Sequence, residues 1–121
     1  MSKIVKAINA MISKSSRISN VFKRDQEVFF LYDSKHKWSI THNTPGGYIL
    51  YYYPIADTSL EDLASNVNWK DIPMVVYNAE DIKTREASES FAELYNIVQS
   101  KLYGIDSLLD EIIEDDTDLP F

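Results

Sequence analysis

The chain has no cysteine, only two histidines and no long apolar run. Without cysteine it can form no disulfide, thiolate metal site or cysteine nucleophile, and a reducing intracellular compartment is expected. No apolar stretch reaches the roughly 7–15 residues of a signal-peptide core or the roughly 20 residues of a membrane span. We therefore expect a cytoplasmic protein with no membrane partner.

Signatures of catalysis are also absent. The sequence contains no G-x-S-x-G, P-loop, G-x-G-x-x-G or H-E-x-x-H motif. Its S-x-x-K spacing, from Ser34 to Lys37, is expected in a hairpin turn, whereas that motif works on the first turn of a helix. His36 and His42 are expected at opposite ends of one strand, too far apart to share a metal ion. The sequence thus predicts no enzyme, no metal site and no cofactor.

Negative charge is plentiful but unevenly distributed. Residues 1–55 contain eight Lys/Arg and three Asp/Glu, a net charge of +5, whereas residues 56–121 contain four and sixteen, a net charge of −12. A phosphate backbone would be repelled by most of the chain, so we do not expect nucleic acid as a partner. A protein with a basic surface is the natural counterpart.

Apolar periodicity and turn residues predict a single α+β domain over residues 1–121. The expected order is α-β-β-β-α-β-α-α, with an antiparallel sheet of about four strands, a three-strand meander plus one, packed with helices. Residues 13–20, rich in serine, are expected as a loop, and residues 115–121 as a flexible acidic tail. The predicted helices cover residues 3–14, 60–66, 82–103 and 105–113, and the predicted strands cover residues 28–32, 37–42, 48–53 and 74–77.

The two hairpins of the meander decide which side chains share a face of the sheet. We expect Tyr32 to lie opposite Lys37 in the first hairpin. Thr44 is placed opposite Gly47 in the second, where a shift of one residue would exchange the faces of the third strand, so this register stays open. The predicted core face carries Phe29, Leu31, Trp38, Ile40, Ile49, Tyr51 and Tyr53. The second face then carries Val28, Phe30, Tyr32, Lys37, Ser39, Thr41, Tyr48, Leu50 and Tyr52.

The second face is a candidate binding surface, because exposed aromatic rings cost free energy unless something covers them. The cover is expected to be either the C-terminal helices or a partner. Acidic residues of the last helix are expected to steer a basic partner. The predicted partner-binding residues are Phe30, Tyr32, Lys37, Tyr48, Leu50, Tyr52, Asp110, Glu111 and Glu114.

These features favour a non-enzymatic interaction protein, such as an immunity protein or other cognate inhibitor that neutralises a basic partner protein. The element order is similar to that of the small acidic chaperones of type III secretion, which implies a chaperone homodimer as an alternative; the resemblance lies in element order and not in a residue motif. A second alternative is a small-molecule-binding or enzymatic domain that uses the aromatic residues with His42 or Tyr51. The partner, the oligomeric state and the order of the acidic tail stay open.

Overall fold

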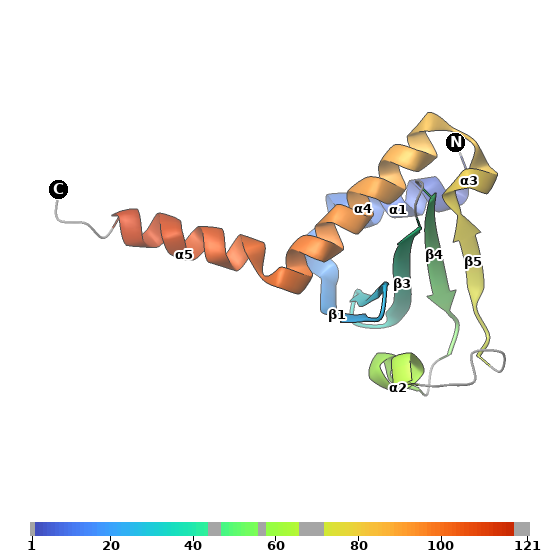
Figure 1. The fold of residues 1–121 in the computed structure, drawn as a ribbon, viewed down its shortest axis with the longest axis horizontal. Coiled ribbons are helices and arrows are strands. Elements are labelled where there is room, and N and C mark those ends of the chain that lie inside the picture. The colour runs from blue at the N-terminus through green and yellow to red at the C-terminus, as the bar shows by residue number, and fades with distance from the viewer. Residues whose placement is uncertain (1, 44–46, 56–57, 66–71, 118–121) are drawn as a thin grey trace.

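The chain folds into two layers, an antiparallel sheet and a layer of helices, with one short helix on the opposite side of the sheet. The structure, a computed structural model, describes residues 2–43, 47–55, 58–65 and 72–117. Within these residues the strands follow the sequence order β1-β2-β3-β4-β5 across one sheet. The predicted α+β class with an antiparallel sheet is confirmed, with five strands instead of about four (Figure 1).

The helices and strands lie close to their predicted ranges, with one strand and one short helix more than expected. The strands are β1 Ile18–Arg24, β2 Glu27–Tyr32, β3 His36–Asn43, β4 Gly47–Tyr53 and β5 Val75–Asn78. The helices are α1 Lys3–Ser13, α2 Leu60–Ser65, α3 Ala79–Ile82, α4 Arg85–Tyr103 and α5 Ile105–Thr117, and a 3-10 turn η1 covers Ser15–Arg17.

Side chains at the helix ends explain why the helices begin and stop where they do. Ser2 caps α1, because its hydroxyl accepts a hydrogen bond from the Val5 N–H at 3.3 Å. Thr84 caps α4 in the same way through the Ala87 N–H at 3.0 Å. Gly104 ends α4 with a φ of 65°, a left-handed conformation that glycine adopts without a Cβ clash. The break between the predicted helices at residues 82–103 and 105–113 therefore falls at Gly104.

The expected loop at residues 13–20 was wrong in its second half, because Ile18 starts the edge strand β1. The pairing of β1 with β2 shifts by one residue between Ser19 and Phe22, which is a β-bulge. Asn20, within the bulge, has a φ of 53°. A bulge breaks the alternation of inward and outward side chains, so this strand lacks the period-two pattern by which strands are predicted.

The first hairpin is tighter than predicted. Tyr32 lies opposite His36 and not opposite Lys37. Asp33 and Ser34 both have positive φ, 58° and 60°, and the Lys35 N–H donates to the Tyr32 carbonyl at 3.3 Å. This turn leaves three residues between the paired positions, where four were expected.

The second hairpin differs from its predicted register by one residue in the opposite sense. Asn43 lies opposite Gly47, and Thr44, which was expected there, is outside the described residues. Strands β2 and β4 therefore keep their predicted faces, because the two shifts compensate. Only β3 is turned over: Trp38 and Ile40 share a face with Phe30, while Lys37, Ser39 and Thr41 lie on the face of Phe29.

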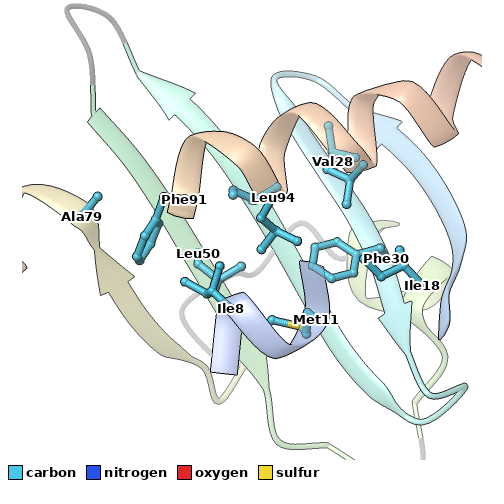
Figure 2. Packing of buried hydrophobic residues seen from close by; sticks show 11 residues of the cluster. Ile8, Met11, Ile18, Val28, Phe30, Leu50, Ala79, Phe91 and Leu94 are labelled. Atoms are coloured by element: carbon cyan, nitrogen blue, oxygen red, sulfur yellow. The ribbon is translucent and has the colours of Figure 1, made fainter. Parts of the chain in front are cut away.

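The larger core lies between the sheet and the pair α1 and α4. Figure 2 shows side chains of both helices meeting those of the sheet in this layer. Ser90 of α4 also donates a hydrogen bond to Asn9 Oδ1 of α1 at 2.7 Å, which ties the two helices together. The fully buried members include Ile8, Val28, Phe30, Ile40, Leu50, Phe91, Leu94 and Val98.

A smaller core lies on the other face of the sheet, under α2. Phe29 and Tyr53 pack there with Leu60 and Leu63 of α2. Phe22 stacks on Phe29 with ring centroids 5.3 Å apart. Both faces of β2 are therefore covered, which explains why this strand is a continuous apolar run and does not alternate.

The last helix, α5, extends away from this body (Figure 1). It continues to Thr117, three residues into the range expected as an acidic tail, and residues 118–121 are outside the described residues. Its large apolar side chains stay in solvent. Leu108, Leu109, Ile112 and Ile113 are 48%, 50%, 56% and 60% exposed.

Candidate functional site

The predicted partner-binding residues do not form one surface. Phe30 and Leu50 are fully buried in the larger core, so they cannot contact a partner. Lys37 lies on the opposite face, where its Nζ donates to the Ile55 carbonyl at 2.6 Å. The prediction that Lys37 shares a face with Phe30 and Leu50 was wrong. The covering elements are α1 and α4, one of which is a C-terminal helix.

Tyr48 belongs to an aromatic cluster at one end of this helix-covered face. The His42 ring stacks on Tyr48 with centroids 4.3 Å apart, and Tyr95 of α4 lies 5.7 Å from His42 and 5.6 Å from Tyr48. The Tyr95 hydroxyl accepts a hydrogen bond from Gln99 Nε2 at 2.6 Å. These contacts fix α4 against the β3–β4 end of the sheet.

Tyr32 and Tyr52 lie at the other end of the same face and line a pocket beside α1. The pocket has a volume of about 430 Å³. Trp38 packs against Tyr52 with centroids 4.8 Å apart, and His36 lies 6.4 Å from Tyr52. We call this the aromatic pocket; its rings are Tyr32, His36, Trp38, Tyr52 and Tyr77, and the α1 residues Ala7, Ala10 and Met11 complete it.

A second pocket adjoins the aromatic pocket and carries basic residues. It has a volume of about 630 Å³ and shares His36 and Tyr52 with the first. Lys35 and Lys37 line it, with Glu61 as an acidic residue on its rim. We call this the basic pocket. The two histidines of the sequence thus share one face of the sheet but lie at opposite ends of β3, as expected.

A buried polar network on the α2 side was not expected from the sequence. Ser39 donates a hydrogen bond to the Glu27 carboxylate, and the Tyr53 hydroxyl lies 2.8 Å from Ser39 Oγ and donates to Glu27 at 3.0 Å. Burial, and then the negative charge of Glu27, raise the pKa of Tyr53 far above its ordinary value, although its hydrogen bond with Ser39 acts in the opposite direction. Burial and Glu27 also raise the pKa of Tyr51.

This network has the character of a structural element. Ser39 is fully buried, and so its hydroxyl is out of reach of a substrate. The sequence signal for it was an acidic residue, Glu27, at the edge of an otherwise apolar strand. The network could be predicted only if Ser39 was placed on the same face of the sheet as Glu27. The predicted register placed Ser39 on the opposite face.

The predicted acidic residues Asp110, Glu111 and Glu114 lie on α5 and are exposed. The exposed apolar residues of α5 are spaced i, i+1, i+4 and i+5, so they form one stripe, and these three carboxylates lie on the rest of the helix surface. Over 105–117 the sequence has six acidic residues and no basic one. We call Leu108, Leu109, Ile112 and Ile113 the α5 stripe.

The carboxylates of α5 do not converge on a common point. Across the part of the chain that the structure describes, no group of three or more His, Asp or Glu side chains is placed to hold a metal ion. No described helix is both long and apolar enough to cross a membrane.

The fold and these sites define a two-layer α+β domain that carries a projecting, acidic, amphipathic helix. Comparison of the chain with protein-family models, curated proteins and solved structures finds no significant match in any of the three. The α5 stripe and the two pockets are therefore the features of this chain that bear on its function.

Proposed function

We propose that this chain is a non-enzymatic interaction protein that docks on one partner protein through α5. The observation that carries the proposal is the α5 stripe: four large apolar side chains, each about half exposed, on a helix that stands away from the core. Contiguous exposed apolar surface is typical of an interaction site. An amphipathic helix laid into an apolar groove is a common mode of protein recognition.

The charge of α5 specifies the chemistry of the partner. Six carboxylates and no cation over 105–117 favour a groove rimmed by Lys and Arg. Opposite charges at the rim would accelerate association, while the apolar anchors would slow dissociation. This chemistry suits an immunity protein or other cognate inhibitor that covers a basic surface of its partner.

A second copy of this chain is a weaker candidate for the occupant of the α5 stripe. Pairing two α5 helices would bring six carboxylates of each helix close together, and like charges at an interface are destabilising. The homodimer of the chaperone alternative would thus need another surface.

The test is affinity capture from the source cells with three tagged forms of the full chain: the wild type, a variant with Leu109→Ser and Ile112→Ser, and a control with Val76→Ser. Val76 is an exposed apolar residue on β5, as exposed as the stripe residues, so its replacement tests the loss of an exposed apolar side chain outside α5. We expect the wild type and the control to retain one stoichiometric basic protein, and the α5 variant to lose it.

Binding that persists in the α5 variant would overturn docking through α5. Recovery of no stoichiometric partner by the wild type would overturn the function itself. Circular dichroism of each form checks the fold. Because the stripe is exposed, we expect its replacement to leave the spectrum unchanged, apart from any helical signal that α5 itself loses. Raising the salt concentration is expected to weaken the captured complex, since the steering charges are exposed.

A further inference from the structure

The aromatic pocket has the form of a ligand site, and it is distinct from the α5 stripe. Its volume of about 430 Å³ falls in the range of about 300–1,000 Å³ that small-molecule sites occupy. Five rings line it, which is the composition of sites that hold flat apolar groups by stacking. The pocket lies between α1 and rings carried by β2, β3, β4 and β5.

Two small residues keep this pocket open. Ala7 and Ala10 lie one helical turn apart on α1 and are exposed, while Ile8 and Met11 of the same helix pack into the larger core. A longer side chain at either alanine would enter the space in front of the rings. The pocket is therefore a product of side-chain size on α1 and does not depend on an unusual backbone.

The adjoining basic pocket indicates the charge of the ligand. Lys35 and Lys37 line it against one acidic residue, Glu61. Lys37 already donates to a backbone carbonyl, so Lys35, which is exposed, is the cation best placed to pair with a ligand anion. His36 and Tyr52 line both pockets, so one ligand can reach from the rings to this cation.

We propose that the aromatic pocket binds a small planar aromatic anion. Its ring system packs on the aromatic rings that line the pocket, and its negative charge faces Lys35. The site is independent of the α5 stripe, so the chain carries two separate binding surfaces.

The probe for this proposal is naphthalene-2-carboxylate, with naphthalene-2-carboxamide as its neutral counterpart of the same shape. Binding is measured by calorimetry and by the indole N–H resonance of Trp38, assigned by its persistence in a Trp69→Phe variant. We expect saturable one-to-one binding with a dissociation constant of about 1 mM or below, given the size of the probe. The Trp38 indole resonance should shift on binding, and the carboxamide should bind several-fold more weakly.

Two variants locate the ligand. Ala10→Leu fills the pocket from an exposed helical position, and we expect it to weaken binding at least tenfold. Ser13→Leu adds the same side chain at an exposed position of α1 that does not line the pocket, and it should bind as the wild type does. Lys35→Ala should weaken the carboxylate several-fold and leave the carboxamide unchanged.

Three outcomes would overturn the proposal. The first is no binding of either probe up to its solubility limit. The second is equal binding by the wild type and Ala10→Leu, with the amide spectrum showing that the variant is folded. The third is binding that disappears in the Leu109→Ser, Ile112→Ser variant, because the probe would then occupy the α5 stripe.

Discussion

At the scale of single residues, the Glu27 network makes a specific contribution to stability. Tyr53 and Ser39 both donate toward one carboxylate in a partly buried site, and hydrogen bonds to charged groups contribute roughly 1.5–3 kcal/mol. Tyr53→Phe keeps the ring stacked near Phe29 and removes only the hydroxyl. We expect a loss of about 1–3 kcal/mol in the free energy of unfolding, measured by urea denaturation.

The matched control for that prediction is Tyr51→Phe. Tyr51 lies on the same strand and the same face but is only half buried, with no hydrogen bond of its hydroxyl found among the described residues. We expect a change of less than about 0.5 kcal/mol, as is usual for partly exposed positions. Equal effects of the two substitutions would show that the Tyr53 hydroxyl contributes no more to stability than the hydroxyl of Tyr51.

The same network predicts how stability depends on pH in alkaline solution. Burial raises the pKa of Tyr53 above its ordinary value of 10.0, so the unfolded chain ionises this tyrosine first as the pH rises. The folded state then holds one more proton, and the free energy of unfolding falls by about 1.4 kcal/mol per pH unit above pH 10 for one such group. The stabilisation is fully present below pH 10.

Urea titrations at about pH 9, 10 and 11 measure this slope. Above pH 10 the free energy of unfolding of Tyr53→Phe should fall less steeply than that of the wild type, because the variant lacks this ionisation. Tyr51, whose pKa is also raised, would account for part of the slope that remains. Parallel curves for the two proteins would contradict the assignment to Tyr53.

At the scale of elements, the bulge in β1 depends on the residue that adopts the left-handed conformation. Asn20 has a φ of 53°, which asparagine tolerates and β-branched residues do not. Asn20→Val should lower the free energy of unfolding by about 1–2 kcal/mol, whereas Asn20→Gly should stay within about 0.5 kcal/mol of the wild type. Thermal denaturation measures the effect. If Asn20→Val unfolds at the same temperature as the wild type, β1 has no bulge at this residue in solution.

The same bulge shows why part of the fold was predictable from sequence and part was not. α1 and α4 carry long apolar stripes and capping residues, and their ranges were nearly right. β1 was missed because the bulge removes its alternation.

The faces of the meander depended on loop length, which sequence does not specify to a single residue. One loop is a residue shorter than assumed and the other a residue longer. This pair of differences turned over only β3. The prediction thus separated Trp38 from Tyr52, and the aromatic pocket could not be found. The projection of α5 depends on tertiary packing, which its local pattern does not encode.

At the scale of the whole molecule, charge is segregated along the chain and the most acidic part stands apart. The α4–Gly104–α5 junction carries the stripe and its carboxylates away from the body (Figure 1). In sedimentation velocity at low ionic strength and about 10–100 μM, we expect no self-association through α5, because like charges repel most strongly at low salt. A dimer that Leu109→Ser with Ile112→Ser abolishes would contradict this and would favour the homodimer.

Photo-cross-linking in the source cells tests the central claim most directly. A photoreactive phenylalanine analogue is placed at Leu109 in the α5 stripe, or at Val76 on β5 as the matched exposed position. Docking through α5 predicts a discrete cross-linked product with one basic protein from position 109 and none from position 76. A product of equal yield from both positions, or from position 76 alone, would contradict it.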